Sequence, residues 1–300
     1  RADSVEFHTP YFATPVLGKI NEKVVTLRDV ESANYPYFTS YAQTLEIKNI
    51  FPEIDYVGGF SMEGLNLKGG ASGGDKASVT VHRKGKPFII IEAKNFKINS
   101  EEISSSNSRA SIFVYGGDII SHPNANFKYT KKEEEFVLTR EGGGNIKSPF
   151  ESTFHQLDMN FEALYWKKGE DALNFGYVKG NDDKSASFES KDFFSYDNFN
   201  QFQGIKQNML RELYKFHISN EEQKELSGIA FANKMKSTIE QIEPIYAKMV
   251  NMGIIYYDKY EQTIYIKDRL KKYVKASSKK GDYDNIQINS DVKSGYNAVL

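Results

Sequence analysis

The chain of 300 residues contains no cysteine and a single tryptophan, Trp166. Without cysteine it forms neither disulfides nor thiolate metal sites, a composition that fits the cytosol and an envelope compartment equally well. Apolar runs are short, as in Phe88-Ile89-Ile90-Ile91, whereas a membrane-spanning helix needs roughly 18 or more apolar residues. The sequence therefore predicts no transmembrane segment.

The aromatic residues that are present are phenylalanine and tyrosine, at 21 and 19 residues. Both favour β-strands, so they bias the expected fold toward β structure. With 39% hydrophobic and 26% charged residues, the composition is that of an ordinary globular protein. A chain of this length usually forms about two domains, because single cores seldom grow beyond roughly 250–300 residues.

Apolar and polar residues alternate through much of residues 1–200, as they do in half-buried strands. The pattern predicts one strand from Leu157 to Tyr165 with the odd-numbered side chains inward, and a hairpin in which Arg83–Lys86 joins two strands. Glycine pairs such as Gly58-Gly59 and Gly69-Gly70 are typical of turns. We expect residues 1–200 to form a β-rich scaffold domain, either a β-sandwich or jellyroll or a β-solenoid-like structure.

Four segments of this region resemble those of known proteins: Gly59–Gly64, Gly85–Phe88, Asp118–Pro123 and Phe161–Trp166. They are similar to segments of very large envelope-associated proteins of Gram-negative bacteria, whose repeated β-layers resemble the open β-jellyroll of lipopolysaccharide-transport proteins. The resemblance implies a structural role and a location in the cell envelope or periplasm. It assigns no catalytic residue, because the similar positions are turn and core residues. The sequence leaves open whether the inward faces form a lipid-lined groove or a closed core.

The hydrophobic period becomes helical near residue 200, which predicts that helix is concentrated after this point. Helices are expected at Gln207–His217 and Ile229–Met235, followed by a third helix whose capping box joins Ser237 to Glu240. Gly253 suits the left-handed position that ends this helix. A buried stripe is expected along the third helix at Ile239, Ile242, Tyr246, Met249 and Val250.

A β-hairpin is expected after the third helix, from strands at Ile254–Tyr257 and Gln262–Lys267. Helices followed by a hairpin give the order of a winged helix, so we expect residues 201–280 to form a winged-helix-like domain. Residues 281–300 would begin a further β segment. The fold class is thus α+β, mainly β, and the chain is expected to be a fragment of a longer protein.

The net charge of −1 combines −5 for residues 1–200 with +4 for residues 201–300. This asymmetry suggests different partners for the two parts. The candidate basic contact patch consists of Lys267, Arg269, Lys271, Lys272, Lys275, Lys279 and Lys280. It could contact nucleic acid or the head groups of anionic lipids, or it could be a solvated helix face and linker.

Sequence-specific DNA binding is not expected, although many winged helices bind DNA. A recognition helix places its N-terminal residues at the base edges. Here that helix carries Glu240 and Glu243 against Lys248, and carboxylates repel phosphates. Winged helices also dock proteins, and protein or intrachain contacts are the preferred interpretation.

No motif predicts catalysis, a cofactor or a metal. The five histidines lack the spacing that places two imidazoles on one helical face, and the glycine loop 69–75 lacks the Gly-Lys-Ser/Thr ending of a phosphate-binding loop. The carboxylates Glu133–Glu135 fit a solvated turn, and Asn181–Asp183 could bind calcium but lacks the spacing of an EF-hand. We therefore expect a non-enzymatic structural segment of a large bacterial envelope protein. The alternatives are a nucleic-acid-binding winged-helix protein and a lipid- or carbohydrate-handling β-protein.

Overall fold

The computed structural model describes residues 1–8, 15–23, 35–64, 66–70, 76–140, 147–178, 185–204, 207–291 and 296–299. Strands account for 51% of the structure and helices for 19%, which confirms the expected β-rich α+β class. The chain divides into two compact units, each assembled from separated stretches. Unit 1 comprises residues 1–141, 162–180 and 294–300, and unit 2 comprises residues 142–161 and 181–293. The boundary expected at residue 200 lies inside unit 2.

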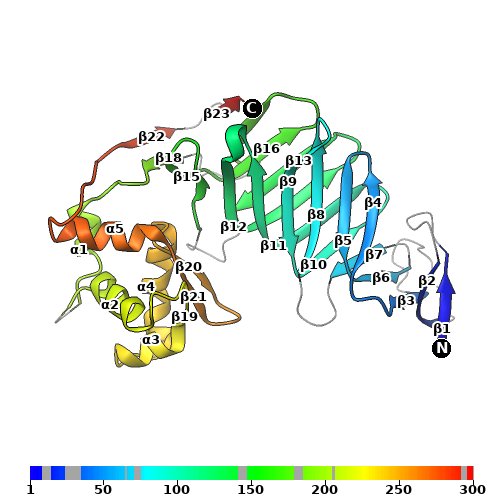
Figure 1. The fold of residues 1–300 in the computed structure, drawn as a ribbon, viewed down its shortest axis with the longest axis horizontal. Helices are drawn as coiled ribbons and strands as arrows, with labels where there is room; N and C mark the ends of the chain where they lie inside the picture. The colour runs from blue at the N-terminus through cyan, green and yellow to red at the C-terminus, as the bar shows by residue number, and fades with distance from the viewer. Residues whose placement is uncertain are drawn as a thin grey trace. The chain divides into compact units, whose positions relative to one another are not determined.

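Unit 1 consists of antiparallel strands and one short 3-10 helix (Figure 1). These elements are β1 (Ala2–Phe7), β2 (Val16–Asn21), β3 (Tyr37–Ser40), β4 (Leu45–Phe51), β5 (Ile54–Gly58), β6 (Phe60–Glu63), β7 (Asn66–Gly70), β8 (Ala77–Arg83), β9 (Lys86–Ala93), β10 (Asn95–Ile98), β11 (Glu102–Phe113), η1 (Tyr115–Gly117), β12 (Ile119–Thr130), β13 (Glu135–Arg140), β16 (Ala163–Lys167), β17 (Ala172–Gly176) and β23 (Tyr296–Val299).

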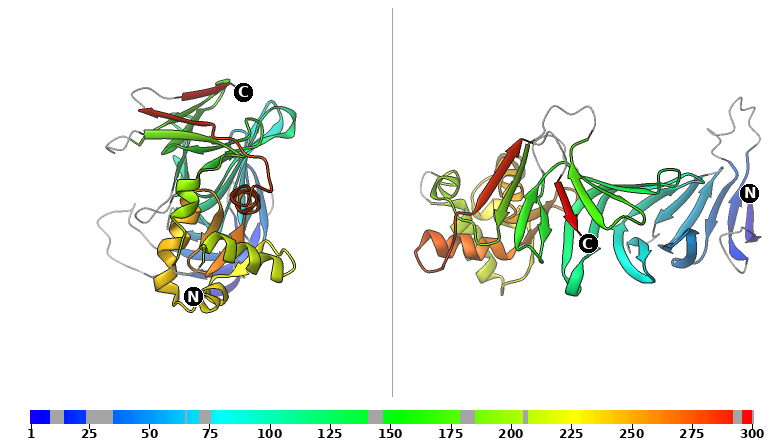
Figure 2. Two further views of the ribbon diagram at one scale, coloured as in Figure 1. Left: turned by 90° about the vertical axis from the view of Figure 1, so that its left-hand side faces the viewer. Right: turned by 90° about the horizontal axis from the view of Figure 1, so that it is seen from above.

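The strands of unit 1 form two ladders that share β11. One ladder runs β4–β5–β8–β9–β11, and the other includes β3–β6–β7–β10–β11–β12–β13–β16. The first half of β11 pairs with β10, as at Ser104↔Lys97, and the second half pairs with β9, as at Arg109↔Glu92. Figure 2 shows from two further directions that these strands twist and bend. Successive strands such as β9 and β10 therefore act as the two halves of one interrupted strand.

The predicted hairpin between β8 and β9 is present. Arg83 pairs with Lys86, and the two residues between them, Lys84 and Gly85, have positive φ angles of 52° and 74°. Two consecutive residues of this conformation form the tight turn whose twist matches that of the flanking strands. Gly85 meets the requirement without the strain that a side chain would add.

Aromatic side chains fill the space between the two ladders. Tyr56 of β5 meets Phe96 of β10 with ring centroids 6.1 Å apart, and Phe88 of β9 meets Trp166 of β16 at 4.7 Å. Tyr56 is fully buried and Trp166 is 1% exposed. In the part of unit 1 that the structure describes, the inward faces thus form a closed aromatic core at these positions.

The glycine pairs that suggested turns lie within strands or at a bend between them. Gly58 ends β5, and Gly69 and Gly70 lie in β7. A Cβ atom at Gly69 would lie 2.4 Å from the Tyr56 Oη, and the Tyr56 hydroxyl donates a hydrogen bond of 2.6 Å to the Gly59 carbonyl. The turn interpretation was wrong for these residues: Gly58 and Gly69 leave room for the Tyr56 side chain, whereas a Cβ at Gly59 or Gly70 would collide with a backbone carbonyl oxygen of a neighbouring segment.

Unit 2 contains two antiparallel sheets and all five α-helices that begin within the described residues. One group of paired strands in unit 2, here called the outer layer, has the order β14–β15–β18–β22. The small sheet has the order β19–β21–β20. The elements are β14 (Phe150–Ser152), β15 (Leu157–Asn160), β18 (Ser185–Ser190), α1 (Tyr196–Asn200), α2 (Met209–Ser219), β19 (Glu225–Ser227), α3 (Gly228–Lys234), α4 (Ile239–Asn251), β20 (Ile255–Asp258), β21 (Thr263–Ile266), α5 (Asp268–Ser277) and β22 (Gln287–Asp291).

The single strand predicted from Leu157 to Tyr165 is wrong. It is divided into β15 of unit 2 and β16 of unit 1. Leu157 and Tyr165 are half-buried, whereas Asp158 is 2% exposed. The alternation assigned Asp158 to solvent because it is charged, yet this side chain faces ion-pairing partners from elsewhere in unit 2.

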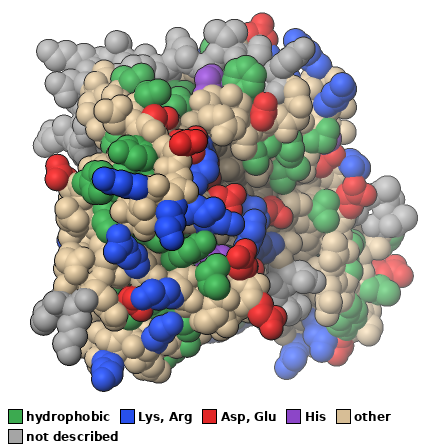
Figure 3. Space-filling view, turned by 60° about the vertical axis from the view of Figure 1, so that its left-hand side comes forward, with side chains coloured by type: hydrophobic (Ala, Val, Ile, Leu, Met, Phe, Trp, Pro, Cys, Tyr) green, Lys and Arg blue, Asp and Glu red, His purple; other side chains and the backbone are tan. Residues whose placement is uncertain are grey.

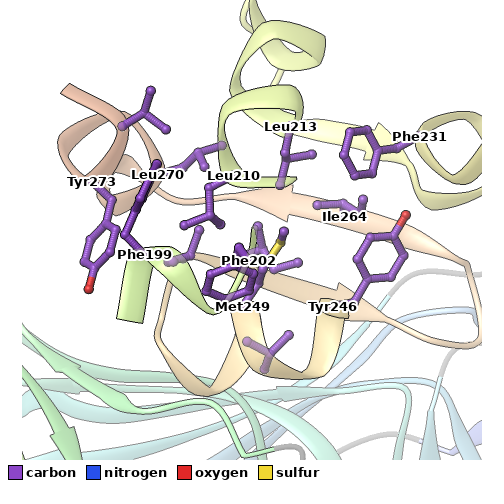
Figure 4. Close-up of a cluster of buried hydrophobic side chains, with 14 of the residues drawn as sticks. Phe199, Phe202, Leu210, Leu213, Phe231, Tyr246, Met249, Ile264, Leu270 and Tyr273 are labelled. Carbon is purple, nitrogen blue, oxygen red and sulfur yellow. The ribbon is translucent and has the colours of Figure 1, made fainter. Parts of the chain in front are cut away.

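The elements from α1 to α5, here called the helical module, enclose their own hydrophobic core (Figure 4). Leu213 of α2, Phe231 of α3, Met249 of α4 and Ile264 of β21 are completely buried in it. The predicted stripe on the third helix is confirmed for Ile242, Tyr246, Met249 and Val250, and Ile239 packs against the same core while partly buried. All α-helices in the described ranges begin at Tyr196 or later, as the change of period predicts.

The capping box of α4 lies one residue later than predicted. Thr238, not Ser237, is the N-cap, and its hydroxyl accepts from the Gln241 amide at 3.4 Å. The Gln241 side chain accepts in return from the Thr238 amide at 3.0 Å. Both Ser-Thr-Ile-Glu and Thr-Ile-Glu-Gln match the pattern, so the sequence could not choose between them. Gly253 has the expected left-handed conformation, with φ of 65°.

Candidate functional site, a buried ion network

Three carboxylates lie in one row across the outer layer of unit 2. Glu151 of β14 is directly opposite Asp158 of β15, and Asp158 is directly opposite Glu189 of β18. Directly opposed like charges destabilise a sheet. The row therefore requires cations close by.

Three cations neutralise the row. The Lys191 Nζ lies 2.9 Å from a Glu151 oxygen and also pairs with Asp158, while Lys267 pairs with the other Glu151 oxygen. One terminal nitrogen of Arg269 pairs with Asp158, and the other lies 2.5 Å from a Glu189 carboxylate oxygen. The six side chains form a network with no net charge, here called the ion network: Glu151, Asp158, Glu189, Lys191, Lys267 and Arg269.

Two cations of the ion network come from the turn that joins β21 to α5. Lys267 is the N-cap of α5 and makes no side-chain capping bond, and Arg269 lies in the first turn of the helix. Carboxylates are favourable near a helix N-terminus, where unpaired amides leave partial positive charge. The acidic row therefore suits both the side chains and the backbone at this end of α5.

The centre of the network is strongly buried. The Asp158 side chain is 2% exposed and the Arg269 side chain 4%. Burial acts to raise the pKa of Glu151, but the charges of Lys267 and Lys191 outweigh it and lower that pKa to about 2. Burial acts to lower the pKa of Arg269, and Asp158 and Glu189 raise it above its usual value instead.

The depressed pKa of Glu151 limits the chemistry that this side chain can perform. A carboxyl with a pKa of about 2 stays ionised and cannot serve as a general acid. Removing one member of a buried ion pair typically costs about 3–5 kcal/mol, because the other member remains buried without compensation. The network therefore joins the helical module firmly to β14, β15 and β18.

The structure divides the seven residues of the predicted basic patch. Lys267 and Arg269 belong to the ion network. Lys272 forms a surface ion pair in which its Nζ lies 2.5 Å from an Asp192 carboxylate oxygen. Four lysines are exposed on α5 or directly after it and form no ion pair within the described residues: Lys271, Lys275, Lys279 and Lys280. On the face drawn in Figure 3, Lys and Arg side chains lie among Asp and Glu side chains.

Sequence reasoning missed the acidic half of the network and Lys191. Glu151, Asp158 and Glu189 are far apart in sequence, and they meet because three short strands place them in register. The available signal was a charged residue inside an apolar alternation, at Asp158. It was interpreted as an outward residue, although a buried charge with partners has the same pattern.

The other residues considered in the sequence do not assemble a metal centre in the described ranges. His82 lies 3.0 Å from Asp55, whose pKa is lowered: burial opposes the shift, and hydrogen bonds from the Asn49 amide, Lys48 and His82 cause it. His155 interacts with the Ser152 hydroxyl at 3.0 Å. No group of three or more potential metal ligands occurs among these residues. Most of the glycine loop and Asn181–Asp183 lie outside them.

Comparisons with protein-family models, with curated proteins and with solved structures found no match to this chain. The described part of the chain contains no helix long and apolar enough to cross a membrane. Functional assignment therefore depends on the geometry of the ion network and the two cores.

Proposed function

We propose that the chain is a non-enzymatic structural segment, in which a winged-helix-like module docks within its own chain through the ion network. The main observation in support is that Lys267 and Arg269 form ion pairs with carboxylates of β14, β15 and β18. A module that used this edge for a nucleic acid would need these cations free. The closed aromatic core of unit 1 fits a scaffold better than a lipid carrier with an open groove.

The order of elements supports the winged-helix interpretation. From α2 to β21 the module runs helix, strand, helix, helix, strand, strand, and β19 completes a small sheet with the hairpin β20–β21. The Tyr246 hydroxyl on α4 donates to the Gly228 carbonyl at 2.8 Å and ties α4 to the start of α3. The module thus has the core and internal hydrogen bonds of a folding unit, and its surface can dock against other parts of the chain.

The helix that would read DNA is acidic in this module. Glu240 is exposed at the start of α4, and Glu243 is neutralised by Lys259 of the neighbouring hairpin at 3.0 Å. Carboxylates at this position oppose the phosphate contacts on which duplex affinity depends. We therefore propose protein or intrachain docking in place of sequence-specific DNA binding, with weak, salt-sensitive contact to anionic lipid or nucleic acid confined to the four exposed lysines.

Hydrogen exchange tests intrachain docking on the full chain. Arg269→Met leaves Asp158 and Glu189 without their shared cation, so amides of β15 and β18 should exchange at least tenfold faster. Amides of α4 inside the module core should keep their protection. Lys275→Met on the exposed face of α5 is the matched control and should change neither region. Unchanged exchange in β15 and β18 after Arg269→Met would contradict docking through the network.

The proposed envelope location rests on the sequence resemblance. Fractionation of the source cells provides its test: the protein should be recovered with the envelope or periplasm. Recovery in the cytosol would remove that part of the proposal and leave the docking proposal standing.

A further inference from the structure

Strand β22 is an edge of the outer layer. Within the described residues it pairs with β18 and with no other strand, in unbroken antiparallel register from Glu189↔Gln287 to Ser185↔Asp291. Edge strands present a row of unpaired amides and carbonyls, and proteins usually protect them with lysine, proline or a bulge. Residues 285–290 contain no charged residue and no proline, and the register shows no bulge.

The direction of the free backbone groups follows from the ladder. The Ser190 amide donates to the Ile286 carbonyl at 3.1 Å, so Ile286 directs its carbonyl toward β18. Backbone groups alternate in direction along an antiparallel strand. Ile288 therefore also bonds toward β18, whereas the amides and carbonyls of Gln287 and Asn289 point away from it.

The side chains of the same edge are apolar on one face and exposed. Ile286 is 56% exposed and Ile288 58%, and Ile288 is the cross-strand neighbour of the half-buried Phe188. These isoleucines continue the apolar face that carries Met159, since Met159 is in turn opposite Phe188. A strand added beside β22 would cover both isoleucines and satisfy the free backbone groups in one step.

We propose that β22 is a dimer interface, at which β22 of a second copy of this chain adds antiparallel about a two-fold axis at Ile288. Gln287 of each copy then lies opposite Asn289 of the other, and these pairs exchange the outward-pointing backbone hydrogen bonds. Ile288 lies opposite Ile288 at a non-hydrogen-bonded position, where side chains approach most closely.

Self-complementarity is the reason for choosing a second copy. With the axis at Ile288, Gln287 lies opposite Asn289, Ile288 lies opposite Ile288, and Ile286 lies opposite Ser290. No like charges are directly opposed, as would occur if a charged residue stood at the axis. Such an isologous contact uses the same patch on both copies, so it closes at two and leaves no open end.

Proline at position 289 is the sharpest test, because it removes an outward amide that β18 does not use. Proline is tolerated on edge strands when its missing N–H faces solvent. Sedimentation velocity of the full chain between about 1 μM and about 1 mM should show a concentration-dependent dimer. Asn289→Pro should be a monomer over this range, whereas the matched control Asn289→Ala keeps its amide and should dimerise as the parent does.

Ile288→Lys provides a second variant that does not alter the backbone. It places two like charges at the axis on a residue that is already largely exposed, so the fold should tolerate it and the dimer should be lost. A parent chain that stays monomeric up to about 1 mM overturns the proposal. So does a dimer that survives Ile288→Lys, and so does an open-ended series of larger species.

Discussion

Truncation of Ile242 to alanine should strongly destabilise the helical module. Ile242 is 1% exposed and lies in the core between α4 and its neighbours. The substitution removes three carbon atoms, worth about 0.8 kcal/mol each in transfer free energy, and the cavity left behind adds to this loss. The expected cost is about 2–5 kcal/mol, and a domain of about 100 residues then melts roughly 10–20 °C lower.

The assay separates the two units by their spectroscopic signals in the full chain. Far-ultraviolet circular dichroism reports mainly on the module, because the α-helices in the described residues lie there, and fluorescence of the sole tryptophan, Trp166, reports on unit 1. Lys248→Ala on the exposed face of α4 is the matched control and should change stability by less than about 0.5 kcal/mol. Equal losses for Ile242→Ala and Lys248→Ala would show that the buried face of α4 has been assigned incorrectly.

Three further predictions concern the tyrosine pocket, the helix cap and the response to acid. Gly69→Ala should destabilise unit 1 by about 1–3 kcal/mol in urea titrations followed by Trp166 fluorescence, because its Cβ would meet the Tyr56 ring, whereas Gly176→Ala has room and should be nearly neutral. Thr238→Ala should lower the free energy of unfolding by about 1 kcal/mol in melts followed by circular dichroism, and Ser237→Ala should lower it clearly less. The reverse order would show that Ser237 is the N-cap, as the sequence predicted. The folded-state pKa of Glu151 is depressed to about 2 from 4.5, so its stabilising effect is complete above about pH 4.5 and is lost as the pH falls toward 2. Glu151→Gln should flatten this part of the stability profile, by at most about 3 kcal/mol, and an unchanged profile would refute the assignment.

The sequence predicted the structure correctly where the local pattern of apolar and turn residues alone determines burial and backbone conformation. The stripe from Ile242 to Val250 and the turn at Lys84-Gly85 depend on neighbours in sequence, and both are present. The segment of α5 was interpreted only as a basic patch, although its buried residues, such as Leu270 and Tyr273, outnumber its lysines. Alternation alone could not show that a strand ends at Asn160 and that a new one begins at Ala163 in the other unit.

The ion network lay beyond sequence reasoning for a different reason. Charged residues are usually outside, so Asp158 and Arg269 were each assigned to the surface. Their burial depends on pairing between residues 111 positions apart, brought together by strand register and the β21–α5 turn. The same limit applied to Gly69, whose smallness is explained by Tyr56 and not by a turn.

A double-mutant cycle at Glu151 and Lys267 tests the ion network most directly. Both lie in unit 2, and their side chains pair in the structure. Glu151→Lys and Lys267→Glu should each lower the free energy of unfolding by about 3 kcal/mol or more, because each leaves like charges in a partly buried site. The double reversal should recover part of the summed loss, and this recovery is the coupling free energy, expected at about 1–3 kcal/mol. Strictly additive losses would mean that these residues do not interact, and intrachain docking through the ion network would have to be abandoned.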